Sequence, residues 1–140
     1  MGQKTVLIVE DDGILAIHLR NMLVGLGYGV SEPVATGEAA IAAVAAERPD
    51  LVLMDIQLAG MMDGITAAGS IHSATDVPIV FLTGYSQGPL LQRARTAAPY
   101  GYLIKPVSRH ELAATIETAL NTRSTVSSGE ARIGITPFIG

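Results

Sequence analysis

Short, unbroken apolar runs limit the folds that this chain can adopt. Residues 5–9, 51–54 and 78–82 are almost entirely apolar, and they lack the alternation expected of a strand with one wet face. Runs of this length are typical of strands buried on both sides, as in a parallel sheet covered by helices. The sequence therefore predicts a parallel sheet with a helical layer on each face.

Segments with helical periodicity separate these runs. A weaker edge strand at 28–35 and a short strand at 101–104 bring the expected number of strands to five. Thr36 suits the N-cap of a helix, and Ser108 to Glu111 fits a capping box. Helices are expected at residues 15–26, 37–48, 65–73, 87–98 and from 108 onwards. Five strands alternating with five helices indicate a doubly wound α/β domain in three layers.

Charged and hydroxyl side chains stand where the predicted strands end. They are Glu10 and Asp11 after the first strand, Asp55 at the end of the third, Thr83 after the fourth and Lys105 after the fifth. Doubly wound sheets bind ligands outside the carboxyl ends of their strands. We therefore expect these five residues to share one crevice.

Such a set favours metal-assisted phosphoryl chemistry. Three carboxylates in one crevice repel one another unless a cation shares the site, and Mg²⁺ prefers oxygen ligands of this kind. One carboxylate can then attack a phosphoryl group and form an acyl phosphate. Asp55, alone at the end of its strand, is the candidate phosphoacceptor, with Lys105 and Thr83 as partners of the phosphoryl oxygens.

Other polar residues have plainer interpretations. An acid at the end of one strand is more often a helix cap or a solvated loop residue, and we expect Asp12 to cap the first helix. The spacing of His18, His72 and His110 suggests no metal site, so surface positions are expected for them.

Taken together, Glu10-Asp11, Asp55, Thr83 and Lys105-Pro106 resemble the receiver domain of two-component response regulators. The resemblance covers residues 4 to 122 and implies a flavodoxin-like α/β/α fold with strand order 2-1-3-4-5. It implies Mg²⁺ bound by Glu10, Asp11, Asp55 and the backbone carbonyl of Gln57. A histidine kinase or a histidine phosphotransfer protein would be the phosphoryl donor.

The resemblance also implies how a signal would be passed on. Thr83 would move toward the phosphoryl group and Tyr102 would turn inward, changing the surface of the fourth helix, fifth strand and fifth helix. The peptide bond before Pro106 is expected to be cis. Such a domain is a signalling phosphoacceptor and not an enzyme with a separate substrate.

The sequence departs from the commonest family pattern beside the acceptor. The loop that follows Asp55 has Ala59 where proline is frequent and one extra residue, so we expect greater mobility there. Gly84 replaces a small side chain after Thr83. Gln57 and Tyr85 occupy positions that tune the attack of water on the phosphate.

Other functions of the same fold stay open or are disfavoured. A pseudo-receiver that binds proteins without phosphorylation is the alternative, although intact Asp55 and Lys105 favour the phosphoacceptor. A phosphohydrolase is disfavoured because Ile56-Gln57 offers no second acid two residues beyond the nucleophile. A flavin binder is disfavoured because the first strand ends in acids, which repel a phosphate.

Composition restricts the setting and the partners. Hydrophobic residues make up 49% of the 140 residues and charged ones 16%, which is typical of a folded domain, and no apolar run is long enough to span a bilayer. The absence of cysteine excludes disulfides and permits a cytoplasmic location. A net charge of -4 with scattered basic residues disfavours DNA binding. An unidentified downstream protein is expected as a partner, and a homodimer is allowed.

The C-terminal residues fall outside the resemblance. We expect a receiver domain at 1–122 and a tail at 123–140, with a polar linker over 121–130 and then a short apolar segment. A frayed tail is the plain interpretation. The sharper one is docking of Ile133, Ile135, Phe138 and Ile139 on this domain or on a neighbouring subunit.

Overall fold

A computed structural model describes residues 2–84, 89–96 and 99–127 of the chain. Its centre is a parallel sheet in the order β2-β1-β3-β4-β5, which confirms the predicted topology. The strands are β1 (Thr5–Val9), β2 (Gly29–Val30), β3 (Leu51–Asp55), β4 (Ile79–Thr83) and β5 (Gly101–Ile104). Because neighbouring strands are parallel, all their carboxyl ends meet at one edge of the sheet.

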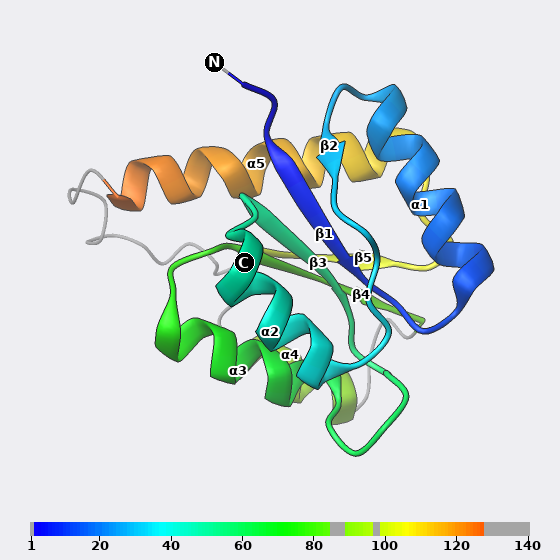
Figure 1. Cartoon of the computed structure of the whole chain (residues 1–140), viewed down its shortest axis with the longest axis vertical. Coiled ribbons are helices and arrows are strands. Elements are labelled where there is room, and N and C mark those ends of the chain that lie inside the picture. Colours follow the sequence, from blue (N-terminus) through cyan, green and yellow to red (C-terminus); the bar gives the residue numbers. More distant parts are fainter. Residues whose placement is uncertain (1, 85–88, 97–98, 128–140) are drawn as a thin grey trace.

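Helices cover both faces of this sheet (Figure 1). They are α1 (Gly13–Gly25), α2 (Gly37–Glu47), α3 (Gly64–Ala74), α4 (Pro89–Thr96) and α5 (Arg109–Ser127). Helices α1 and α5 pack on one face, and α2, α3 and α4 pack on the other. The predicted three-layer arrangement is therefore confirmed.

The unbroken apolar runs are explained by this double cover. In β1, Val6 and Ile8 face the α1/α5 layer, while Leu7 and Val9 face the α2/α3/α4 layer, and all four are fully buried. Side chains that alternate between two dry faces must all be apolar. Strand β3 is buried along its whole length for the same reason.

Three of the predicted helix starts have the expected caps. Asp12 accepts hydrogen bonds from the backbone N–H groups of Ile14 and Leu15, at 3.0 and 3.2 Å. Thr36 accepts one from Ala39 at 3.1 Å. The capping box is formed by reciprocal bonds between Ser108 and Glu111. Each cap satisfies backbone donors that the helix itself leaves unpaired.

The last helix corrects the prediction for the C-terminal residues. Helix α5 continues to Ser127, so the linker expected from Asn121 is wrong over 121–127 and the boundary at 122 falls inside a helix. The Arg123 Nη2 lies 2.7 Å from the Asp76 carboxylate, and its Nη1 donates to the Asp50 carbonyl at 3.3 Å. Arg123 thus belongs to the packed domain.

Other differences are smaller. The edge strand is shorter than expected, because β2 holds two residues and the chain after it rejoins β1 only through a bridge between Val9 and Val34. Strand β4 begins one residue later than predicted and includes Thr83. The predicted start of the fourth helix at 87 and the apolar tail residues beyond 130 lie outside the described residues. No helix in the described part of the chain is long and apolar enough to cross a membrane.

Candidate functional site

The carboxyl ends of the strands bring three acids together, as predicted. Carboxylate oxygens of Glu10, Asp11 and Asp55 lie within 4.8 Å of one another. Glu10 and Asp55 are almost completely buried, at 3% and 4% exposure, whereas Asp11 is exposed. Two acids of the cluster are therefore shielded from solvent, and the cluster is open to solvent at Asp11.

Lys105 supplies the positive charge of the crevice. Its Nζ donates to Asp55 Oδ2 at 3.0 Å and lies 3.3 Å from Glu10 Oε1. The Lys105–Pro106 peptide bond is cis, as predicted. One ammonium group thus contacts both buried acids of the cluster.

Burial and the neighbouring charges shift the pKa values of Glu10 and Lys105. Burial, followed by contact with Asp55, raises the pKa of Glu10 to about 7. Burial lowers the pKa of Lys105, but its hydrogen bond to Asp55 and the charges of Asp55 and Glu10 outweigh that effect and raise the pKa overall. The lysine stays charged at neutral pH, and Glu10 holds a proton part of the time.

The donor atoms of the cluster fit a hard divalent cation. Glu10 Oε2 accepts a hydrogen bond from the Asp12 backbone N–H at 3.1 Å. Glu10 Oε1 is buried and has no hydrogen-bond partner within the described part of the chain, although it lies 3.3 Å from the Lys105 Nζ. A buried, unsatisfied oxygen among carboxylates suits Mg²⁺ with part of its water shell. The three histidines, His18, His72 and His110, are exposed as expected and belong to no such cluster.

Asp55 is fixed by its backbone as well as by Lys105. Its Oδ1 accepts a hydrogen bond from the Gln57 N–H at 3.1 Å, and the Gln57 side chain is exposed. Gly64, the first residue of α3, lies directly against the backbone of Asp55, where a Cβ atom would collide with the Asp55 carbonyl oxygen. The sequence shows Asp63-Gly64 only as a loop signal, so this role of Gly64 was missed.

The proposed switch residues lie on neighbouring strands. Thr83 ends β4, is 2% exposed and faces Ile104 across the ladder, while its carbonyl accepts a hydrogen bond from the Lys105 N–H at 2.8 Å. Tyr102 lies opposite Phe81, and its half-buried ring packs on the α2/α3/α4 face. Burial raises the pKa of the Tyr102 hydroxyl. Tyr85 lies outside the described residues.

The long loop after Asp55 is attached to neighbouring elements at several points. Ala59 forms a bridge with Thr36, and the Met62 side chain covers Gly37. Met61 is 97% exposed, so the extra length of the loop is displayed to solvent. Gly60 has a φ of 91°, a conformation that side chains rarely adopt.

An ion pair that the sequence did not predict connects two helices beside this loop. Asp63 caps α3 by accepting from the Thr66 N–H at 2.8 Å, and its other oxygen lies 2.8 Å from Arg93 of α4. Burial opposes ionisation of Asp63, but the bonds from Arg93 and Thr66 lower its pKa overall. Partners 30 residues apart on different helices leave no sequence signal.

Comparison with known proteins gives one consistent family. A model of the response regulator receiver domain matches residues 6–117. The transcriptional regulatory protein PdtaR of Mycobacterium tuberculosis is 36% identical over 130 residues, covering 93% of this chain and 63% of PdtaR. The phyllosphere-induced regulator PhyR of Methylorubrum extorquens is 32% identical over 127 residues, covering 90% of this chain and 47% of PhyR. The chain thus spans less than two thirds of either relative.

Solved structures with the same architecture are also similar in sequence. The signal receiver domain of a modulated diguanylate cyclase from Desulfovibrio desulfuricans superposes with a TM-score of 0.84 at 37% identity, covering 89% of this chain and 99% of that one. The receiver domain of the sensor histidine kinase PA1611 from Pseudomonas aeruginosa has a TM-score of 0.78 at 31% identity, covering 86% and 99%. That structure has a magnesium ion coordinated in its active-site cleft.

Proposed function

Since the chain belongs to the response regulator receiver domain family, we propose that it accepts a phosphoryl group on Asp55 and thereby switches a protein-binding surface. Members of this family are signalling domains and not classical enzymes. The observation that carries the proposal is the joint contact of one lysine with two buried acids, Asp55 and Glu10, beside the exposed Asp11. A charged site of this kind suits an incoming phosphoryl group and not a neutral substrate.

The proposed step is a transfer between two nucleophiles. The Asp55 carboxylate attacks the phosphorus of a phosphohistidine on a histidine kinase or phosphotransfer protein. A P–O bond forms, the P–N bond breaks, and its electron pair returns to the imidazole, which takes up a proton. Hydrolysis then ends the phosphorylated state: water attacks the phosphorus, the P–O bond to Asp55 breaks, and inorganic phosphate leaves the restored carboxylate.

The residues around Asp55 have separate proposed tasks. Lys105, already bonded to Asp55, would neutralise one phosphoryl oxygen, and the Thr83 hydroxyl would donate to another. Mg²⁺, when bound, supplies charge neutralisation between the carboxylates and the phosphoryl oxygens. We assign its protein ligands to Asp11, Asp55, the Gln57 carbonyl and Glu10, whose unsatisfied oxygen supports this choice.

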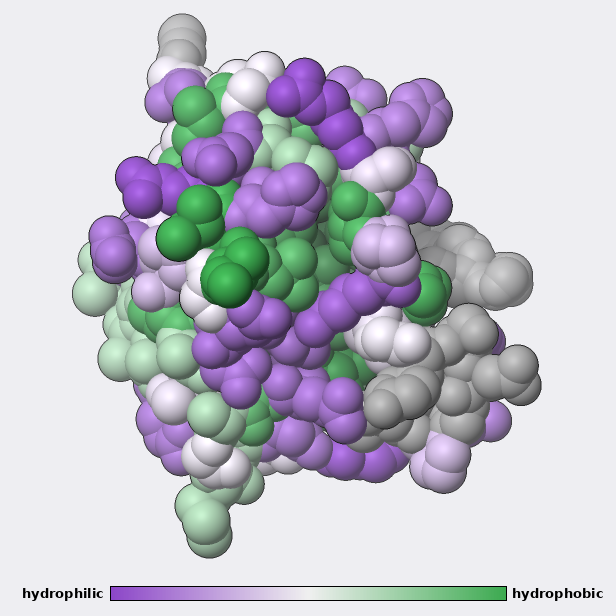
Figure 2. All heavy atoms as spheres, turned by 90° about the vertical axis from the view of Figure 1, so that its right-hand side faces the viewer, coloured by the Kyte–Doolittle hydropathy of each residue, from purple (hydrophilic) through white to green (hydrophobic). Residues whose placement is uncertain are grey.

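The outer face of α1 suits docking of the phosphoryl donor. Ile14, Ile17 and Val24 are 83%, 59% and 55% exposed, although all three are large and apolar. Ile14 comes three residues after Asp11, so this face begins beside the acidic cluster. Figure 2 views the molecule from the α1 side, where apolar patches lie among hydrophilic surface. A donor helix packed there would place its histidine near Asp55.

The proposed output passes from Thr83 to Tyr102. We infer that Thr83 moves toward the phosphoryl group and that the half-buried Tyr102 turns further inward. The affected surface would be formed by α4, β5 and α5, where Ile104 is 40% exposed and Tyr102 is half-buried. Its partner is a protein in the cytoplasm, and the chain's net charge of -4 supports a protein and not DNA as that partner.

Phosphorylation of the purified chain tests the proposal. Incubation with acetyl phosphate and Mg²⁺ is expected to add one phosphoryl group by intact mass, and chelation by EDTA should abolish the addition. Asp55→Asn should take up none. Asp12→Asn is the matched control, because asparagine also caps helices and Asp12 is bonded to α1, so phosphorylation should persist.

A second measurement distinguishes a phosphoacceptor from a pseudo-receiver. Beryllofluoride with Mg²⁺ should change the NMR signals of Tyr102 and Thr83 in the wild type but not in Asp55→Asn. A wild-type chain that gains no mass and shows no response to beryllofluoride would overturn the proposal in favour of a phosphate-independent binding module.

A further inference from the structure

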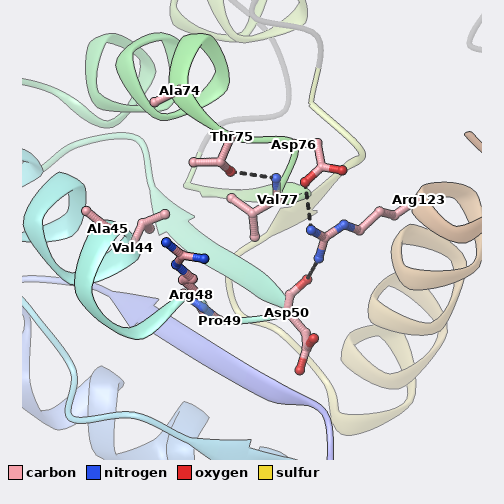
Figure 3. A pocket seen from close by; sticks show the side chains of 10 residues that line it. All are labelled: Val44, Ala45, Arg48, Pro49, Asp50, Ala74, Thr75, Asp76, Val77 and Arg123. Atoms are coloured by element: carbon pink, nitrogen blue, oxygen red, sulfur yellow. Dashed lines mark hydrogen bonds and ion pairs between the residues drawn. The ribbon is translucent and has the colours of Figure 1, made fainter. Parts of the chain in front are cut away.

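A cavity of about 520 Å³ lies at the edge of the sheet opposite the acidic cluster. It is formed by the C-terminal ends of α2 and α3, the segments that lead into β3 and β4, and Arg123 of α5 (Figure 3). Small-molecule sites in proteins are commonly 300–1,000 Å³. The cavity therefore has room for a small ligand or a short side-chain segment, and the phosphoryl chemistry does not use it.

The walls of this cavity combine apolar surface with two guanidinium groups. Val44, Pro49 and Val77 are buried and contribute apolar wall. Arg48 and Arg123 stand on either side of Val77, one at the end of α2 and the other on α5 (Figure 3). A ligand that fits must therefore present both an apolar part and a group that arginine binds.

The guanidinium groups of the two arginines differ in their hydrogen bonds and ion pairs. Arg123 is held by the Asp76 carboxylate and the Asp50 carbonyl. The Asp50 carboxylate is directed to Thr5, accepting from its N–H at 2.7 Å and from its hydroxyl at 3.2 Å. The Arg48 backbone N–H donates to the Val44 carbonyl at 3.0 Å, but its guanidinium makes no hydrogen bond or ion pair with any residue that the structure describes. It is thus the guanidinium available to a ligand.

The backbone of Arg48 gives a second, independent reason to single it out. Its φ is 49°, in the left-handed region, at the position after α2 that glycine or asparagine usually occupies. A long side chain there costs stability that glycine would avoid. Residues held in such conformations are found more often at functional sites, which makes Arg48 a residue to test.

We propose that this cavity binds a carboxylate joined to a short aliphatic body, with Arg48 pairing with the carboxylate. The guanidinium geometry matches a carboxylate in a two-point contact, and Val44 and Val77 would cover the aliphatic part. A singly charged anion is favoured over a phosphate because Asp50, Asp76 and the carbonyl ends of two helices already offset the two arginines. The carboxylate could be that of a free acid or that of Glu130, the only acid beyond α5 in the sequence.

NMR titration of the 140-residue chain tests this site without Mg²⁺ or a phosphoryl donor, so its outcome is independent of the proposed function. The probe is 4-methylpentanoate, with 4-methylpentanamide as its neutral counterpart and inorganic phosphate as the other anion. The acid should shift the methyl signals of Val44 and Val77, whereas the amide and phosphate should bind about tenfold more weakly or not at all.

Variants identify the contact and the source of the ligand. Arg48→Gln should weaken binding of the acid about tenfold, and Arg20→Gln, an exposed arginine on α1 outside the cavity, should not. Equal binding by the wild type and Glu130→Gln identifies a free acid as the ligand. Binding that strengthens about tenfold in Glu130→Gln identifies the chain's own carboxylate as a competitor for the same site.

Three results would overturn the proposal. They are equal affinity for the acid and the amide, an unchanged affinity in Arg48→Gln, and binding of phosphate in preference to the carboxylate. A chain that binds no acid either as wild type or as Glu130→Gln would also exclude it.

Discussion

Arg48 shows how much one residue can reveal through its backbone. It is the non-glycine residue with positive φ in the described part of the chain, and the strain of that conformation is independent of what its side chain binds. Arg48→Gly should therefore raise the free energy of unfolding by about 0.5–1 kcal/mol, the relief of strain exceeding the extra freedom of glycine in the unfolded chain. Urea denaturation of the purified variant measures this difference.

Arg48→Ala separates the backbone effect from the loss of the guanidinium. Alanine keeps the Cβ atom, so the left-handed strain remains, and stability should change by less than about 0.5 kcal/mol. A glycine variant that is less stable than the alanine variant would contradict the assignment of strain to this position.

Single residues also show where sequence reasoning succeeds and fails. Glu10, Asp55 and Lys105 could be predicted because each ends a strand, and parallel strands bring their ends to one edge whatever the details of packing. The contact of Gly64 with Asp55 depends on the path of a loop, and so does the pair between Asp63 and Arg93. Neither loop path is encoded in local periodicity.

At the scale of elements, the start of α3 determines how closely that helix approaches β3. A Cβ atom on Gly64 would collide with the Asp55 carbonyl, which is backbone and cannot turn aside. Gly64→Ala should lower the free energy of unfolding by about 1–3 kcal/mol, as overpacking of a tight contact does. It should also slow phosphorylation by acetyl phosphate, because the acceptor must shift.

The same helix offers a matched control. Gly69 lies in the exposed middle of α3, and a Cβ atom there meets nothing within 4 Å. Gly69→Ala should stabilise the chain by up to about 1 kcal/mol through helix propensity alone. Thermal unfolding of the two variants should give opposite shifts, and two shifts of the same sign would refute the close-approach argument for Gly64.

Helix α5 shows the limit of patterns at this scale. Its apolar stripe ends at Leu120, and the polar residues that follow predicted a linker. The helix continues to Ser127 because extending an existing helix costs little per residue, and Arg123 finds partners in Asp76 and the Asp50 carbonyl. Asp76 is largely exposed, so this ion pair contributes weakly, and only the packed geometry reveals it.

For the whole molecule, the carboxylate cluster makes folding depend on pH. Glu10 has its pKa raised to about 7 when folded, from an ordinary value of 4.5. Between these two values the folded chain retains a proton that the unfolded chain has released, so stability falls as pH rises through this window. Without Mg²⁺ the fall attributable to Glu10 should be up to about 3 kcal/mol, measured as the change, across this pH window, in the difference in unfolding free energy between wild type and Glu10→Gln.

Metal binding should reverse this trend. Mg²⁺ competes with the proton on Glu10. At one hundred times its dissociation constant at pH 7.5 it should stabilise the wild type by about 2.7 kcal/mol at that pH, and the same concentration should stabilise it less at pH 5. Above pH 8 Glu10 is ionised in both the folded and the unfolded chain. The difference in unfolding free energy between wild type and Glu10→Gln should then no longer change with pH. A difference that instead grows with pH above 8 would rule out Glu10 as its source.

The architecture of the whole chain was largely predictable from the sequence. Alternating buried runs and amphipathic segments leave few arrangements once crossovers are right-handed. Pro33 and Glu32 already favoured an edge position for the second strand, whereas the full strand order 2-1-3-4-5 required the family resemblance. The cavity beside Arg48 was not predicted, since it arises where α2, α3 and α5 happen to end together.

Strand β3 has a mechanical consequence for signalling. Its five residues are all buried, its middle three pair with both β1 and β4, and Asp55, the last of the five, pairs with Leu82 of β4. Such a strand is a stationary frame, so a chemical change on Asp55 cannot be accommodated by displacing the residue that carries it. If Asp55 is phosphorylated as proposed, the movement should occur in the side chains and loops that meet the phosphoryl group, with Asp55 as the fixed point from which their displacement is measured.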